Sequence, residues 1–313
     1  MIKVANLAYG RLRAPDLDRE EAFLSDFGMV RAARTKTALY MRGTGPAHHI
    51  HVTELGETGT IGLAFAVNDA ADLERASATD GASGIEAIDE PGGGRRARLT
   101  DPNGYQIEIV HGIERLDELP VRDNPVNTGL EPDRRLGKLT RLPKGPSQVR
   151  RLGHAVFATA RFEETVAWYR RHLGLIGSDD IYAGAEDNVI CSFNRCDQGP
   201  AHVDHHVLMC LKKQHTGLNH LAYEVQDMDD LFIGHEHLKG TGSYQHMWGI
   251  GRHILGSQVF DYWCDPFGRV HEHWTDIDML SAEVPTNLLS AEEGLGSQWG
   301  EPAPERFINH YSP

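Results

Sequence analysis

Short runs in which apolar and polar residues alternate recur along this chain, and each series begins with an amphipathic segment of helical spacing. Residues 7–30 predict a strand, a turn and a helix that ends near Gly28. Residues 153–176 repeat this pattern without a gap, so that Gly174 falls on Gly28. The runs that follow are separated by Gly, Asp and Pro, which favours strands joined by turns. The chain is therefore predicted to contain two copies of one unit.

The repeat extends through both halves of the sequence. Three further matches occur in the same order: "AHHIHV" at 47–52 with "DHHVLM" at 204–209, "IGLAFAVNDAADL" at 61–73 with "NHLAYEVQDMDDL" at 219–231, and "LTDPNGYQIEI" at 99–109 with "WCDPFGRVHEH" at 263–273. Each half also divides into two smaller units of one helix and several strands. The preserved order indicates internal duplication. The predicted fold class is α+β, with tandem βαβββ modules, two per domain.

The repeat sets the predicted domain boundaries. Residues 1–115 form an N-terminal domain, and residues 150–276 form a C-terminal domain. Residues 116–149 are rich in proline and poor in large apolar side chains, which is typical of an extended linker. Residues 277–313 form a C-terminal tail.

Composition and charge exclude several classes of protein. The 313 residues are 40% hydrophobic and 24% charged, as expected of a globular chain. The apolar runs are too short to cross a membrane, and the first residues lack the apolar region of a signal peptide. A formal charge of −14 without a basic stripe argues against nucleic acid as a partner. The four cysteines have no C-x-x-C spacing, so we expect free thiols and a cytoplasmic location.

The stretch "FGRVHEHWTD" at 267–276 places ionisable side chains where a strand should carry core residues. With a period of two, Glu272 shares one face with two apolar neighbours, while His271 and His273 lie on the other face. A buried carboxylate is costly unless it is paired or bound to a metal ion. We therefore interpret Glu272 as a metal ligand.

The two halves differ at the positions that could bind this metal. The matched pairs are Ala8 with His154, Gly62 with His220, and Glu108 with Glu272. Alanine and glycine offer no side-chain ligand, so only the C-terminal copy keeps all three. Two histidines and one carboxylate match the facial triad of non-haem iron(II) oxygenases. The sequence predicts one metal site, in the C-terminal domain.

The stretch "GRHILGSQVFDYWCDPFGRVHEHWTD" at 251–276 resembles the signature of the type I extradiol (meta-cleaving) catechol dioxygenases. These enzymes belong to the vicinal oxygen chelate (glyoxalase/bleomycin resistance/dioxygenase) superfamily, and the resemblance extends over about residues 1–280. It implies two barrel domains of the vicinal oxygen chelate type, with metal only in the second. It also implies that His154, His220 and Glu272 hold Fe(II), or Mn(II) as in some members.

The resemblance further implies a set of catalytic residues around the metal. His206 matches the family's acid/base that faces dioxygen, and His253 and Tyr262 match the residues that hydrogen-bond the substrate hydroxyls. The implied reaction inserts both atoms of O2 into a substituted catechol and gives a muconic semialdehyde-type product, in the degradation of aromatic compounds. The implied partners are a catecholic small molecule and further copies of the chain, with neither nucleic acid nor a membrane.

Two other functions are compatible with such a fold. One is a metal-dependent glyoxalase or isomerase of the same superfamily, and the other is a non-catalytic module that binds small molecules. Among the remaining side chains, His205 is expected to face outward, because it neighbours His206 on a strand. Five histidines are expected to face solvent: His202, His215, His235, His237 and His246. In the tail, Trp299, Arg306 and Phe307 are candidates to cover the mouth of the site, and a loosely attached tail is the alternative.

Overall fold

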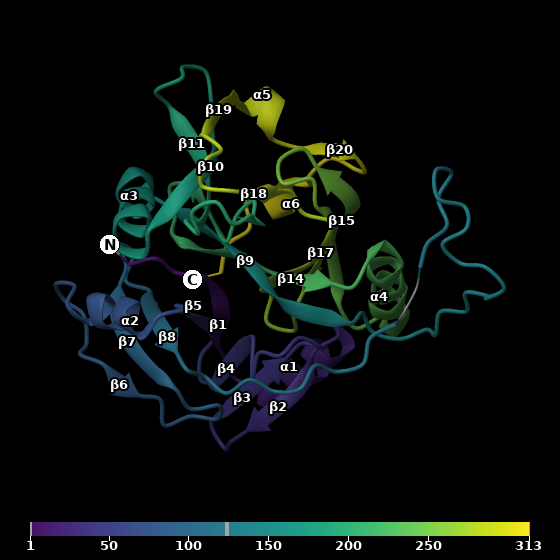
Figure 1. The fold of residues 1–313 in the computed structure, drawn as a ribbon, viewed down its shortest axis with the longest axis horizontal. Coiled ribbons are helices and arrows are strands. Elements are labelled where there is room, and N and C mark those ends of the chain that lie inside the picture. Colours follow the sequence, from purple (N-terminus) through teal and green to yellow (C-terminus); the bar gives the residue numbers. More distant parts are fainter. Residues whose placement is uncertain (1, 123–124, 313) are drawn as a thin grey trace.

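The computed structural model describes residues 2–122 and 125–312, and it contains one large mixed sheet in each half of the chain (Figure 1). The N-terminal sheet has the order β2-β3-β4-β1-β5-β8-β7-β6. Its strands are β1 (Asn6–Ala14), β2 (Val30–Arg34), β3 (Ala38–Arg42), β4 (His51–Leu55), β5 (Gly59–Ala66), β6 (Glu86–Ala87), β7 (Arg95–Thr100) and β8 (Gln106–His111). Its helices are α1 (Leu17–Asp26) and α2 (Ala70–Ser77).

The C-terminal sheet repeats this order and is extended by one strand at each edge, as β19-β10-β11-β13-β9-β14-β17-β16-β15-β20. Its strands are β9 (Val149–Thr159), β10 (Leu175–Tyr182), β11 (Val189–Cys196), β13 (Leu208–Lys212), β14 (Gly217–Val225), β15 (Gln245–His253), β16 (Val259–Cys264), β17 (Val270–Thr275), β19 (Asn287–Ser290) and β20 (Ser297–Trp299). Its main helices are α3 (Phe162–Leu173) and α4 (Met228–Thr241). A separate small sheet pairs β12 (Val203–Asp204) with β18 (Met279–Leu280).

The strand order confirms the predicted α+β class and its tandem βαβββ modules. In each half, the first strands of the two modules pair with each other antiparallel, β1 with β5 and β9 with β14. Within each module the last strand returns parallel to the first, as β4 does to β1 and β17 to β14. Helix ends follow the sequence signals, because Asp16 caps α1 through its side chain and Gly174 ends α3 in the left-handed conformation.

Strand register corrects one pair of the predicted repeat. His154 pairs with Ala222 across β9 and β14, and the residue that pairs with the equivalent Ala64 is Tyr9. The structural counterpart of His154 is therefore Tyr9, and matching it with Ala8 was wrong by one residue. The gapless comparison was aligned on Gly28 and Gly174, which follow helices of different length, because α1 has 10 residues and α3 has 12. The strands before these helices are therefore displaced by one residue in that comparison.

The two halves pack on each other through their first helices. On the side of the C-terminal half, α1 contacts β17, because the ring centroids of Phe23 and His271 are 5.3 Å apart. Next to this contact, Arg269 Nη2 lies 2.8 Å from Glu20 Oε1 of α1. His273 Nε2 lies 2.6 Å from the carbonyl oxygen of Phe27 and stacks on its ring. Conversely, the Tyr169 hydroxyl of α3 donates to Asp101 of the N-terminal half. These contacts explain why one face of β17 carries histidines: it forms the interface between the halves.

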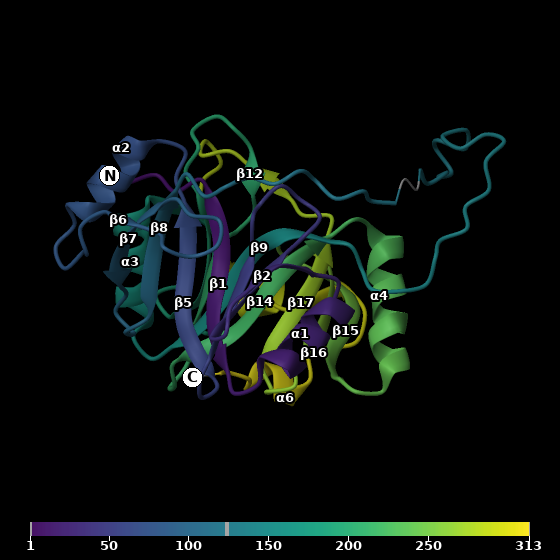
Figure 2. The same cartoon turned by 90° about the horizontal axis from the view of Figure 1, so that it is seen from below.

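Two segments lie outside the modules. From residue 112 to 148, the described residues form no helix or strand, and the middle of this segment extends beyond α4, away from both sheets (Figures 1 and 2). The tail after residue 276 crosses the open side of the C-terminal sheet. It contains β18, β19, α5 (Ala291–Gly294), β20 and α6 (Glu305–Ile308). No helix in the described ranges is long and apolar enough to cross a membrane.

Candidate active site and metal centre

The three residues predicted to bind metal come together in the C-terminal sheet. His154, His220 and Glu272 lie on β9, β14 and β17, and one ligand atom from each lies within 4.8 Å of the others. Nε2 of His154 is 3.1 Å from Oε2 of Glu272, and Nε2 of His220 is 3.2 Å from the same oxygen. All three side chains are buried.

Sheet register explains this convergence. On the central strand β14, Ala222 pairs with His154 on one side and with Glu272 on the other. The three residues therefore form one row across the sheet. His220 lies two positions before Ala222, so it projects from the same face.

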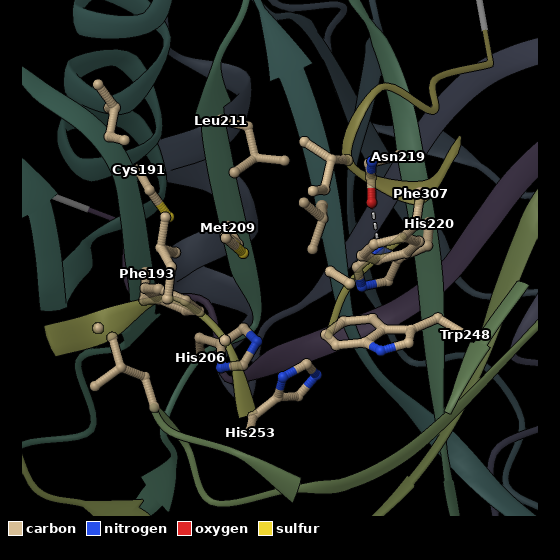
Figure 3. A pocket seen from close by; sticks show the side chains of 18 of the residues that line it. Cys191, Phe193, His206, Met209, Leu211, Asn219, His220, Trp248, His253 and Phe307 are labelled. Carbon is tan, nitrogen blue, oxygen red and sulfur yellow. Dashed lines mark hydrogen bonds between the residues drawn. The ribbon is translucent and has the colours of Figure 1, made fainter. Parts of the chain in front are cut away.

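The donor set fits a divalent cation. Both carboxylate oxygens of Glu272 and Nε2 of His220 are buried without a hydrogen-bond partner, which is costly unless an ion completes the group. Nδ1 of His220 lies 2.7 Å from Oδ1 of Asn219, so its proton is held there and Nε2 keeps a free lone pair (Figure 3). Burial alone would raise the pKa of Glu272, but the imidazoles of His154 and His220 outweigh burial and hold that pKa well below its usual value.

The predicted catalytic side chains surround these ligands. The ring centroid of His206 is 4.2 Å from that of His154. On the other side, Nε2 of His253 is 2.8 Å from the Tyr262 hydroxyl and 3.7 Å from Oε1 of Glu272. Figure 3 shows His206 and His253 turned towards each other in one cavity.

Burial sets the protonation of this group. It lowers the pKa of His206 well below its usual value, and nearby His154 lowers it further, so His206 is neutral at pH 7. Burial and the charge of Glu272 raise the pKa of Tyr262 well above its usual value, so its hydroxyl keeps its proton. The site therefore offers a neutral imidazole on one side and a hydroxyl donor on the other.

Two residues behind His206 were missed by sequence reasoning. His205 does not face outward as expected, because it is 3% exposed. Its Nδ1 is 3.1 Å from Nδ1 of His206, and its Nε2 is 2.5 Å from the Asp179 carboxylate. When Nε2 of His205 donates a hydrogen bond to Asp179, Nδ1 of His205 accepts a hydrogen bond from Nδ1 of His206. Nε2 of His206 then carries no proton and can only accept one. The available signal was the "HH" pair, which both halves share.

The N-terminal half keeps the histidine pair but not the candidate metal site. Nδ1 of His48 lies 3.0 Å from Nδ1 of His49, as in the other half. Glu108, the counterpart of Glu272, accepts a hydrogen bond from the Tyr9 hydroxyl. It also lies beside two guanidinium groups, with Nε of Arg11 at 3.6 Å and Nη1 of Arg96 at 3.5 Å. Side-chain cations thus balance the carboxylate that a metal ion would balance in the C-terminal domain.

The site opens into a cavity of about 560 Å³ with largely apolar walls. Phe193 and Trp248 line it, whereas Met247 is buried and does not. Six aliphatic or sulfur-containing side chains form much of the wall: Ile190, Cys191, Met209, Leu211, Leu255 and Leu295.

The tail forms part of this cavity. Phe307 packs against Tyr262, with ring centroids 4.6 Å apart, and against Trp248 at 5.0 Å. Asn219 Nδ2 donates to the carbonyl oxygen of His310, so the residue that orients His220 also holds the tail. Of the other predicted tail residues, Arg306 donates to backbone carbonyls of β15, and Trp299 lies on β20 at the edge of the sheet.

The remaining histidines are less exposed than expected. His202 is exposed, as predicted, but His215 stacks on Tyr311 with ring centroids 3.8 Å apart. His235, His237 and His246 are half-buried, and each contacts an aspartate. The expectation of solvent-facing side chains was wrong for these four, because α4 and the tail cover sheet surfaces that sequence spacing does not reveal. The four cysteines are free, as expected, and all are buried.

Comparison with known families agrees with this geometry. Residues 151–270 match the family described as Glyoxalase/Bleomycin resistance protein/Dioxygenase superfamily. The C-terminal half of the chain is a domain of this superfamily. The match covers the strands that carry His154 and His220, and it ends two residues before Glu272.

Relatives cover both halves of the chain. Metapyrocatechase 2 of Cupriavidus necator is 29% identical over 98% of this chain and 92% of its own length. Among solved structures, a Mn(II)-bound glyoxalase from Novosphingobium aromaticivorans has a TM-score of 0.80 at 22% identity, over 100% of this chain and 97% of its own. Homoprotocatechuate 2,3-dioxygenase from Brevibacterium fuscum has a TM-score of 0.80 at 18% identity, over 99% and 93%. The structural matches establish a shared two-domain fold.

Proposed function

We propose that this chain is an extradiol ring-cleaving dioxygenase that acts on a substituted catechol. The observation that supports this most strongly is one apolar cavity in which His206, His253 and Tyr262 surround a buried set of two histidines and one glutamate. The full-length similarity to Metapyrocatechase 2 points the same way. In this proposal His154, His220 and Glu272 hold Fe(II), with Mn(II) as the other candidate.

The bound metal would supply open coordination positions for both catechol oxygens and for dioxygen. His253 is placed to take a proton from a substrate hydroxyl, because its Nε2 faces the metal ligands. The protonated Tyr262 hydroxyl would donate to the resulting oxyanion. Across the cavity, neutral His206 would take up a proton and return it as the ring opens. Both oxygen atoms enter the product, so no external reductant is needed.

The cavity wall favours catechols with an apolar substituent. Its aliphatic side chains would exclude water from an alkyl or aryl group. Two lysines also line the cavity, but Lys212 is already paired with Glu163 at 2.6 Å. We expect alkyl-substituted catechols to have a lower KM than carboxyl-substituted ones in a substrate panel. A lower KM for carboxyl-substituted catechols would instead indicate that Lys213 binds the carboxylate of the substrate.

The experiment that tests this function is oxygen uptake. Protein purified without oxygen, loaded with Fe(II) or Mn(II) and mixed with catechol, should consume one O2 per catechol in air and form a yellow product. Comparing the two metals identifies the active one. A metal-loaded protein that consumes no oxygen would contradict the proposal. It would favour the second candidate, a glyoxalase-type enzyme, which the Mn(II)-bound structural neighbour suggests.

We further propose that the chain forms a homo-oligomer in the cytoplasm. Three leucines of the segment that extends beyond α4 are highly exposed: Leu130 at 96%, Leu136 at 72% and Leu139 at 80%. Such exposure in an extended segment is typical of an interface between copies. Replacing all three with serine should lower the mass measured by analytical ultracentrifugation. An unchanged mass would move the interface elsewhere.

A further inference from the structure

A second group of metal-ligating side chains lies on the face of the C-terminal sheet opposite the cavity. Nε2 of His246 is 2.8 Å from Oδ1 of Asp261, and Nδ1 of His235 is 3.1 Å from Oδ2. These residues come from β15, β16 and α4, which runs beside the sheet (Figure 2). Asp261 precedes Tyr262 on β16, and strand alternation therefore turns its side chain away from the cavity that Tyr262 lines.

This group has the donor set and spacing of the first site. Its three ligand atoms lie within 4.8 Å of one another, as do those of His154, His220 and Glu272. The imidazole rings of His235 and His246 are 5.0 Å apart and nearly perpendicular at 89°. Those of His154 and His220 are 5.6 Å apart at 78°. Both groups thus direct two imidazole nitrogens at one carboxylate.

We propose that His235, His246 and Asp261 form a second binding site, for a borderline divalent cation such as Zn²⁺, with water completing its coordination. Zinc takes imidazole nitrogen at about 2.0–2.1 Å and carboxylate oxygen at about 2.0–2.2 Å. Ligand atoms around such an ion lie about 3 Å or slightly more from one another, so the observed 2.8–3.1 Å needs little adjustment.

The surroundings of Asp261 support an ionic ligand. Trp263 Nε1 donates to its Oδ2 at 2.6 Å, which orients the carboxylate as supporting hydrogen bonds do at metal sites. Burial alone would raise the pKa of Asp261, but hydrogen bonds from His235 and His246 outweigh it and keep that pKa below its usual value. The side chains of His235 and His246 are 15% and 31% exposed, so an ion could enter from solvent.

A third group of metal-ligating side chains differs from the group at Asp261 in the charges that surround its carboxylates. Glu20, Asp265 and His271 also bring ligand atoms within 4.8 Å. Arg269, itself fully buried, already lies against both carboxylates there. Around Asp261, the ion pairs found among the described residues involve only the two histidines. A guanidinium group thus lies between the carboxylates of the third group, whereas only the two imidazoles and the Trp263 indole contact the carboxylate of Asp261.

Bound metal would join α4 to β15 and β16, the strands that carry His253 and Tyr262. Zn²⁺ binding at this site does not depend on the proposed reaction, so it can be measured in a variant whose first site is disabled. Glu272→Ala protein is stripped of metal by a chelator and titrated with Zn²⁺. The expected result is one Zn²⁺ per chain by calorimetry and elemental analysis, with a rise in Tm. Adding His246→Ala should abolish both the Zn²⁺ binding and the rise in Tm.

The matched control is His237→Ala in the same Glu272→Ala background, because His237 is a half-buried histidine of α4 that contacts Asp26 instead. It should leave the bound Zn²⁺ unchanged. His235→Gln provides a second disabling variant if His246→Ala fails to fold. Glu272→Ala protein that binds no Zn²⁺, or binds it equally with and without His246, would overturn the proposal. Neither result depends on whether the wild-type chain cleaves catechol.

Discussion

At the scale of single residues, the role of Glu272 depends on compensation of a buried charge. It is fully buried and its oxygens lack hydrogen-bond partners. We expect Glu272→Ala to abolish metal binding at the first site while the protein stays folded, because removal of the buried charge offsets part of the lost packing. Iron or manganese content after loading, with circular dichroism, measures both. Glu186→Gln, an exposed glutamate, is the control and should keep full metal content.

His206 can be separated from metal binding. We expect His206→Phe to keep the metal and to bind substrate, but to lower kcat by roughly 10²–10⁴-fold, which is typical of losing an acid/base group. Steady-state kinetics at saturating metal tests this. A kcat equal to that of the wild type would assign the proton transfers to another residue.

Asp179 should act through His205 as a positioning residue. In Asp179→Asn, the neutral amide no longer favours the proton on Nε2 of His205, so the tautomer of His206 is less restricted. We expect a smaller loss of kcat than in His206→Phe, together with a shifted pH profile. A uniform loss at every pH would indicate that Asp179 supports only the local fold.

At the scale of elements, the tail is the part of the chain that decides access to the cavity. Phe307 lies between Tyr262, Trp248 and His220, with ring centroids 4.6–5.9 Å away. One aromatic contact is worth about 0.5–1.5 kcal/mol. We therefore expect Phe307→Ala to raise the KM for catechol about 2- to 10-fold with metal content unchanged. Deletion of residues 297–313 should have a larger effect, and an unchanged KM in both would dismiss a covering role.

The interface between the halves depends on a buried ion cluster. Arg269 contacts Glu20 of α1 and Asp265 of its own half, and all three side chains are 0% exposed. Arg269→Ala would remove the cation between these two buried carboxyl groups. We expect it to lower the free energy of unfolding by about 3–5 kcal/mol, measured by urea denaturation. Arg31→Ala, at a half-exposed surface pair with Glu21, should change it by less than about 1 kcal/mol.

At the scale of the whole molecule, buried neutral histidines should make stability depend on pH. Burial, aided by His48 and Arg11, lowers the pKa of His49 to about 3, and burial lowers that of His51 well below its usual value. Between the unfolded pKa of about 6.5 and pH 3, the unfolded chain binds protons that the native state does not. Stability is therefore present above pH 6.5 and lost as the pH falls below it.

The size of this effect can be measured with metal-free protein. Each such histidine should remove about 1.4 kcal/mol per pH unit below 6.5. We expect the urea midpoint to fall between pH 7 and pH 5, and His49→Gln to reduce that slope. A midpoint independent of pH over this range would contradict the neutral, buried state of His49.

The sequence by itself determined the duplicated α+β architecture and singled out three residues, His154, His220 and Glu272, that the structure brings together as a candidate metal site. Internal repetition is visible without coordinates, and Glu272 is conspicuous because a carboxylate on an apolar strand face needs a counter-charge. The position of His206 followed from the resemblance, and the structure brings it beside His154 in one cavity.

Only the tertiary structure decided which distant side chains share an environment. Three examples are Asp179 behind His205, Arg11 and Arg96 around Glu108, and the group at Asp261, each of which is brought together from different strands or helices. Strand periodicity reports only which face a side chain lies on. Whether that face meets solvent, a helix or the other half depends on packing between elements, and that is why histidines that are half-buried in the structure were expected at the surface.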